Sequence, residues 1–113
     1  MTVIYKIAPT TLWREAEAAG VFAGSPDDRR DGFIHCSTAE QLPGTAARYF
    51  AGAADLVLAA IAVGKLAGPL RWEPSGGGAL FPHLYAPLDL GAILWVKPLP
   101  LGPDGRHVFP EDL

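Results

Sequence analysis

The order of the expected elements predicts an α+β fold with a mixed or antiparallel, split sheet and two short helices on one side of it. Two observations support this prediction. Several short segments alternate between apolar and polar residues or are apolar throughout, and Gly and Pro bound them, which is typical of strands. Two further segments carry the cap and terminator residues of helices. The 113 residues suffice for one core, so we expect a compact single domain over residues 1–113.

The first third of the chain predicts a strand, a helix, a loop and a second strand. In the expected strand Val3–Ile7 successive side chains alternate between two faces, and the strand ends at Pro9. Thr10 or Thr11 can then cap a helix that runs to Gly20, a suitable left-handed terminator. Residues 21–32 are rich in Gly, Ser, Pro and charge, so we expect a loosely structured loop with solvated charges.

The rest of the chain predicts a second helix followed mostly by strands. After the expected strand at 33–37, the spacing of Ser37 and Glu40 matches a capping box, and the helix should end near Gly52. The unbroken apolar run 56–63 predicts a central strand that is buried on both faces. Further strands are expected at 70–73, 84–86 and 93–97. We expect a flexible glycine loop at 75–78 and a loosely structured tail at 99–113.

Composition excludes several classes of protein. Half of the residues are hydrophobic and 19% are charged, which is ordinary for a folded domain. The net charge of −3 argues against a general nucleic-acid surface. Cys36 is the only cysteine, so no intrachain disulfide can form. No leader is evident and the longest apolar run is too short to span a membrane, so we expect a cytoplasmic protein without a membrane partner.

Two short runs place chemically able side chains at every second residue. In the run at 33–37, His35 and Ser37 share one face of a strand, while Ile34 and Cys36 point toward the core. In the run at 81–85, a histidine and a tyrosine again share a face. A histidine with a hydroxyl on each of two strands favours a lined cleft over a plain surface.

Metal and nucleophile chemistry have weaker support. No His-x-His or His-Glu-x-x-His spacing is present, so we expect no metal and keep a zinc site only as a minor alternative. Cys36 is adjacent to His35 on a strand and therefore faces the other way, which favours a small buried hydrophobe. No Gly-x-Ser-x-Gly elbow precedes a helix, which argues against a serine hydrolase.

The motifs also carry a family resemblance. IYKI, GFIHCST, DLVLAAIAVGKL, RWEP and LFPHLYAPLDLGAILWVKPL follow one another along nearly the whole chain. In this arrangement the chain resembles a family of small uncharacterised bacterial and plant proteins known as domain of unknown function nine-five-two. That family looks like a compact relative of the ADP-ribosyltransferase fold. The resemblance therefore implies a cleft for NAD, ADP-ribose or a related nucleotide, with NAD as a substrate.

Two departures from the transferase pattern bear on the reaction. Lys6 stands where such transferases use a histidine to hold the adenosine ribose, and His83 stands near the place of the catalytic glutamate. A carboxylate stabilises the sugar cation of ADP-ribosyl transfer better than a neutral imidazole does. The branch that removes a splice-junction phosphate from RNA lacks this glutamate, and its His-Val-His-Leu-Ser strand resembles the run at 33–37. Nucleotide binding is thus implied more firmly than any one reaction.

The expected roles follow from chemistry and from the resemblance together. The catalytic candidates are His35, His83 and Glu73, and the candidates for ligand binding are Lys6, Phe22, Ser37, Arg48, Arg71 and Tyr85. Lys6, with Arg48 or Arg30, would pair phosphates, and Tyr85 or Phe22 would stack on a base. Glu73 would contact a ribose or hold a histidine in one tautomer.

Each role has a duller alternative. The histidines could be hydrogen-bonded core residues, Ser37 a helix cap, and Arg71 with Glu73 a surface pair. Two classes of function follow: an enzyme acting on NAD, ADP-ribose or a phosphorylated nucleotide, and a non-catalytic module that binds a small molecule or a protein. The expected partner is a nucleotide-like small molecule, with a phosphorylated RNA end as the one nucleic-acid candidate. The oligomeric state stays open.

Overall fold

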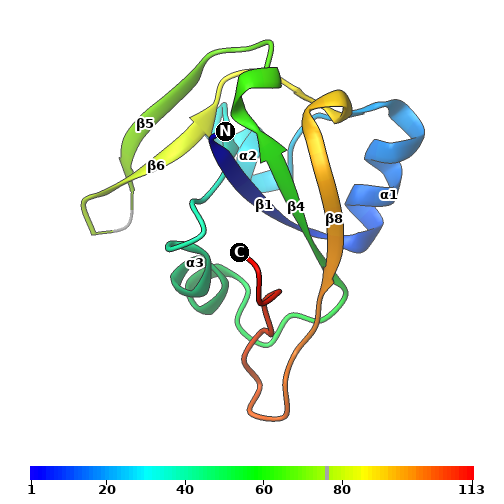
Figure 1. Ribbon diagram of the computed structural model, residues 1–113, viewed down its shortest axis with the longest axis vertical. Coiled ribbons are helices and arrows are strands. Elements are labelled where there is room, and N and C mark those ends of the chain that lie inside the picture. The colour runs from blue at the N-terminus through cyan, green and yellow to red at the C-terminus, as the bar shows by residue number, and fades with distance from the viewer. Residues whose placement is uncertain (76) are drawn as a thin grey trace.

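A three-stranded antiparallel sheet forms the centre of the protein (Figure 1). In the computed structural model, which describes residues 1–75 and 77–113, its strands are β1 (Val3–Pro9), β4 (Leu56–Ala62) and β8 (Ile93–Leu99). β4 lies between the other two, and all seven of its residues are buried. This confirms the prediction of a central strand covered on both faces.

The remaining strands form two smaller antiparallel groups. β3 (Ile34–His35), β6 (Ala79–Leu84) and β5 (Leu70–Ser75) pair in that order, and β2 (Val21–Phe22) pairs with β7 (Leu88–Asp89). The sheet is therefore split, and every pairing among the described strands is antiparallel. The predicted glycine loop includes residue 76, which lies outside the described residues.

Helices cover both faces of the central sheet, which corrects the expectation that they share one side. α1 (Thr10–Ala19) packs Trp13 against the β1 face that carries Ile4 and Ala8, and α3 (Leu42–Tyr49) packs Leu42 against the face that carries Tyr5. Because β4 is apolar on both sides, each side needs a cover. Two short 3-10 helices, η1 (Val63–Lys65) and η2 (Leu90–Ala92), flank β4 and β8. α1 ends at Gly20 with φ of 81°, as predicted.

The expected loop at 21–32 contains a third α-helix. α2 (Pro26–Asp31) begins after Ser25, whose hydroxyl accepts a hydrogen bond from the Asp28 backbone N–H at 3.2 Å. The Asp28 carboxylate accepts one in return from the Ser25 N–H at 2.9 Å, so the two residues form a capping box. The charged composition favoured a loop, but the spacing of Ser, Pro and Asp is a helix start. The prediction of a loosely structured segment is therefore wrong.

The start of α3 also differs from the prediction. Thr38 and Gln41 exchange backbone-to-side-chain hydrogen bonds of 3.0 and 3.3 Å in the turn before the helix, whereas the Ser37 hydroxyl contacts Thr45. The helix opens at Leu42, and Ser37 does not cap it. The strand expected at 84–86 lies earlier, at Ala79–Leu84, because it pairs with β5 in that register.

The end of the chain is attached to the domain. Leu101 and His107 form an isolated bridge, His107 Nε2 lies 2.9 Å from the Ala53 carbonyl oxygen, and Phe109 packs against the core on the α3 side. These contacts hold part of the tail that was expected to be loosely structured, and His107 is half-buried there. In the described part of the chain, no helix has the length and apolar character needed to cross a lipid bilayer.

Candidate active site

The two histidines predicted to share a cleft face each other across paired strands. The antiparallel register of β3 and β6 sets His35 directly opposite His83, so both side chains leave the same face of the sheet. Their ring centroids lie 5.6 Å apart in an edge-to-face arrangement. Both line a cleft of about 480 Å³. The geometric prediction that these imidazoles meet in one hollow is confirmed.

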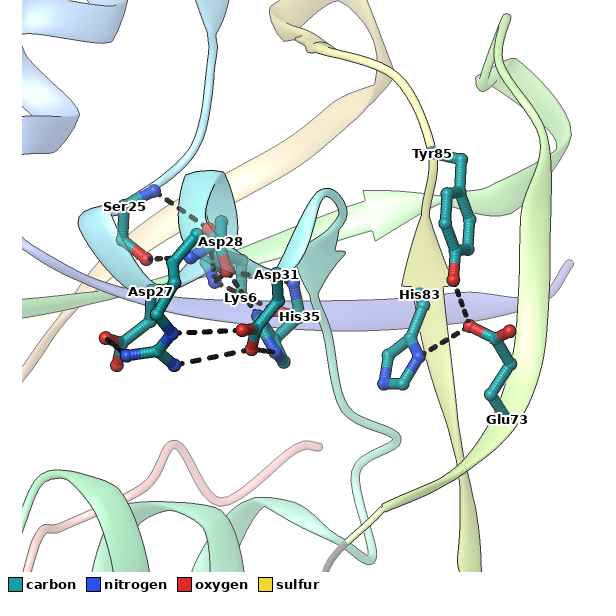
Figure 2. Close-up of polar contacts among 10 residues, drawn as sticks. Lys6, Ser25, Asp27, Asp28, Asp31, His35, Glu73, His83 and Tyr85 are labelled. Atoms are coloured by element: carbon teal, nitrogen blue, oxygen red, sulfur yellow. Dashed lines mark hydrogen bonds and ion pairs between the residues drawn. The ribbon is translucent and has the colours of Figure 1, made fainter.

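A carboxylate behind His83 fixes the orientation of its ring. His83 Nδ1 lies 2.8 Å from Glu73 Oε1, and the Tyr85 hydroxyl donates to the same oxygen at 2.6 Å (Figure 2). The hydrogen bond from Tyr85, followed by that from His83, lowers the pKa of Glu73, and the contact with Glu73 raises the pKa of Tyr85. A carboxylate acceptor at Nδ1 selects the tautomer that leaves a lone pair on Nε2.

A second, more deeply buried carboxylate holds His35. Asp28 Oδ1 lies 2.6 Å from His35 Nδ1 and accepts the His35 backbone N–H at 3.0 Å. The Lys6 ammonium lies 3.0 and 2.9 Å from the two Asp28 oxygens and donates to the His35 carbonyl at 2.8 Å. Although burial raises the pKa of Asp28, the hydrogen bonds from His35 and the charge of Lys6 outweigh it, and the net pKa is well below the ordinary range.

The other nitrogen of His35 meets a third carboxylate. His35 Nε2 lies 3.0 Å from Asp31 Oδ2, and the Arg30 guanidinium donates to both Asp31 oxygens at 3.0 and 3.4 Å. Hydrogen bonds from Arg30, which outweigh the effect of burial, lower the pKa of Asp31. Both ring nitrogens of His35 thus face carboxylate oxygens, Nδ1 that of Asp28 and Nε2 that of Asp31.

Phe33 connects the two histidine clusters. Its ring stacks on His83 with centroids 4.0 Å apart, and it lies 4.5 Å from the His35 ring and 5.2 Å from the Tyr85 ring. These aromatic contacts restrict the rotation of both imidazoles. Phe33 therefore positions the pair without offering a polar group.

Other side chains give the cleft its polar wall. Ser37 and Thr45 share a hydrogen bond of 3.0 Å between their hydroxyls, and Arg48 and Gln41 lie on the same α3 side. Six predicted residues line the cleft: Lys6, Arg30, His35, Ser37, Arg48 and His83. Lys6 is only 5% exposed and already paired with Asp28, so its charge serves the protein itself.

Four predicted residues lie away from the cleft lining. Phe22 is 2% exposed and packs against Trp13, so no face of its ring is open to a base, which corrects its stacking role. Glu73 and Tyr85 lie behind His83, and the Arg71 guanidinium lies 4.8 Å above the Tyr85 ring. Of the two roles predicted for Glu73, its contact with His83 Nδ1 favours the tautomer-holding one. Tyr85 therefore acts on Glu73 rather than on a base in this cleft.

Sequence reasoning missed Asp28, Asp31, Phe33 and Thr45. A signal existed for Asp28, because Ser25 and Asp28 have capping-box spacing. No local pattern connects Asp28 with Lys6, which lies 22 residues earlier in the chain. Among the described residues, no three side chains of the His, Cys, Asp and Glu types are grouped to hold a metal ion. The expectation of no metal stays a prediction.

Comparison with known proteins gives a family. Residues 7–96 match the family described as protein of unknown function, DUF952. The chain belongs to this family. The family match agrees with the resemblance seen in the sequence motifs, but it does not bear on the ADP-ribosyltransferase likeness, which stays a prediction.

Solved structures of a similar protein support the fold. The chain is 47% identical to protein CC0527 from Caulobacter crescentus, whose crystal structure matches with a TM-score of 0.89 over 95% of this chain and 94% of that one. A double mutant of CC0527 matches equally well at 46% identity. Its solution NMR structure matches with a TM-score of 0.83 at 48% identity, over 94% of this chain and 91% of that one. No curated protein matches the sequence.

Proposed function

We propose that this member of the family is an enzyme that binds a nucleotide-like small molecule in the cleft and acts on it by proton transfer. One observation carries the proposal: two imidazoles, each oriented by its own carboxylate, face the same cleft with ring centroids 5.6 Å apart. Carboxylate-oriented imidazoles are the usual general acids and bases of enzymes near neutral pH. The proposed compartment is the cytoplasm, where such ligands occur.

His83 is the proposed general base. Its Nδ1 is turned to Glu73, so Nε2 is the nitrogen left to take a proton from a ligand hydroxyl or a water. His35, flanked by two carboxylates, suits the opposite role of donor to a developing negative charge. The two rings thus differ in surroundings in the way that an acid and its matching base require.

A phosphorylated nucleotide or RNA end fits this cleft better than NAD or ADP-ribose as the reacting partner. Glycosyl transfer from NAD needs a carboxylate at the ribose, and Glu73 is committed to His83 and Tyr85. Hydrolysis or transfer at a phosphate needs a base, a proton donor and cationic groups, which His83, His35 and Arg48 provide at the cleft. The ADP-ribosyltransferase-like fold implied by the sequence motifs keeps NAD and ADP-ribose as the second ligand class.

Substitution of His83 tests the proposal. With purified protein and a panel of NAD, ADP-ribose, nucleoside phosphates and phosphorylated RNA ends, H83Q should lower turnover by roughly 10²- to 10⁴-fold, the usual contribution of a general base. E73Q keeps the shape of the side chain but loses the charge that orients the His83 ring. Its turnover should therefore lie between that of H83Q and that of the unmodified protein. H107Q, which changes a histidine in the tail, serves as the matched control and should keep full activity.

The same panel distinguishes the alternative of a non-catalytic binding module. That alternative draws on the pairing of Lys6 with Asp28 inside the protein, which commits the Lys6 charge to the fold rather than to a ligand phosphate. A saturating ligand at about a hundred times its Kd should raise stability by roughly 2.7 kcal/mol. A raised Tm with unchanged ligand would favour the module, and turnover that H83Q does not affect would refute the assigned base.

A further inference from the structure

Asp31 occupies a place that resembles a site for an anion. Two Arg30 nitrogens donate to its carboxylate, Nε at 3.0 Å and Nη2 at 3.4 Å, and His35 Nε2 lies 3.0 Å from its Oδ2. Arg30, Asp31 and His35 all line the cleft. The planar fork of an arginine together with an imidazole N–H is a common way to bind oxyanions.

Asp31 differs from Asp28 in how firmly it is held. The Asp28 side chain is 2% exposed and lies between Lys6, His35 and Ser25, whereas the Asp31 side chain is 34% exposed. Its partner Arg30 is 67% exposed, and exposed ion pairs contribute little to stability because water screens them. The Asp31 carboxylate can therefore leave its donors at little cost, while Asp28 stays in place and keeps the His35 ring oriented.

The position of Asp31 in its helix gives it no evident stabilising role there. It is the last residue of α2, whose C-terminal end carries the negative end of the helix dipole. A carboxylate is unfavourable at this end, and the helix already has its capping box at the other end. The contacts that favour Asp31 at this position are therefore those with His35 and Arg30, not those with its own helix.

We propose that Arg30 and His35 form the phosphoryl subsite of this cleft and that the Asp31 carboxylate occupies the subsite until a phosphoryl group displaces it. The inference rests on the proposed ligand class, but not on the proposed reaction. Displacement frees the Arg30 guanidinium and the Nε2 side of the His35 ring for a ligand. A phosphoryl group carries more charge and more acceptor oxygens than a carboxylate, so it can bind the arginine fork and the imidazole together. Three further acids line the cleft, namely Asp27, Asp28 and Glu40. Asp28 is neutralised by Lys6, and Asp27 keeps its own contact with Arg30 Nη1 at 3.0 Å.

Titration with inorganic phosphate tests the subsite. The intact protein, D31N, D27N and R30Q are compared at constant pH and ionic strength, with Kd measured from the NMR shifts of the His35 ring nitrogens. D31N removes the internal competitor, so phosphate should bind roughly tenfold more tightly. D27N removes an equal charge from the other side of the same arginine and should change Kd by less than about threefold. R30Q should lose most of the affinity.

The outcomes separate the inference from general electrostatics and from the proposed reaction. Equal gains for D31N and D27N, or no gain for D31N, would overturn the subsite, as would phosphate shifts that spare the His35 ring. H107Q, which changes a histidine outside the cleft, should bind phosphate like the intact protein. Tight phosphate binding by D31N without turnover of any nucleotide would refute the proposed reaction and leave the subsite standing. Turnover by R30Q with the same KM as the intact protein would refute the subsite and leave the proposed reaction standing.

Discussion

At the scale of single residues, the buried pair of Lys6 and Asp28 holds the site together. The pair lies between β1 and α2, and through Asp28 it fixes both the ring and the backbone of His35. Breaking a buried pair leaves an uncompensated charge, so D28N should lower the free energy of unfolding by about 3–5 kcal/mol in urea titrations. D27N, on the exposed side of the same helix, should change it by less than about 1 kcal/mol. Equal losses of stability in D28N and D27N would show that the buried pair stabilises the fold no more than the exposed one does.

The same pair predicts a pH dependence. Because folding lowers the pKa of Asp28, its contribution to stability is complete above the ordinary aspartate pKa of about 3.9 and declines as the pH falls through the lowered folded value. The intact protein should therefore lose stability steeply below roughly pH 4, and D28N should show a flatter acid limb. Urea unfolding between about pH 2 and pH 7 measures both curves. Parallel curves would contradict the assigned role.

Alternation along two strands was enough to predict that the two histidines share a cleft, but not what holds them. The faces of His35, Ser37, His83 and Tyr85 follow from the two-residue period of a strand, which is a local property. The partners of these residues depend on tertiary placement. Asp28 reaches Lys6 only after α2 folds onto the sheet, and Phe22 is sequestered by α1, so composition could not reveal either fact.

At the scale of elements, α2 is the segment whose formation builds the His35 side of the site. It has six residues, too few for a stable helix alone, so its capping box matters more than usual. S25A should cost about 1 kcal/mol of stability and should weaken the hold on Asp28. T11A is the matched control, since it changes an exposed helix residue that caps nothing, and it should be nearly neutral. Comparable losses in both variants, measured by thermal unfolding, would count against this role of Ser25.

The strands were more predictable than the helix ends. Apolar runs bounded by Gly and Pro marked β1, β4 and β8 to within a few residues, because those patterns reflect burial directly. The short helix α2 and the turn that leads into α3 each depend on one reciprocal pair of hydrogen bonds, of Ser25 with Asp28 and of Thr38 with Gln41. Several capping spacings occurred close together, and the sequence alone did not say which one the chain uses.

At the scale of the whole molecule, the two cores on either side of β4 make one cooperative unit. Phe109 in the tail packs on the α3 side together with Leu99 and Trp95. F109A should therefore lower the global free energy of unfolding by about 1–2 kcal/mol, less than for a fully buried ring. V108A, in the same tail with 52% exposure, should stay within about 0.5 kcal/mol. An unchanged stability in F109A, followed by urea unfolding, would mean that the tail is not part of this unit.

β3 is a strand of two residues, and its shortness limits how long the two histidines stay paired. His35 and His83 come from segments far apart in the chain, and a two-residue strand joins them, whereas β1, β4 and β8 are each seven residues long. Segments with few backbone bonds exchange amide hydrogen through partial opening, without unfolding of the rest. The imidazole pair should thus separate and re-form many times within the lifetime of the folded sheet.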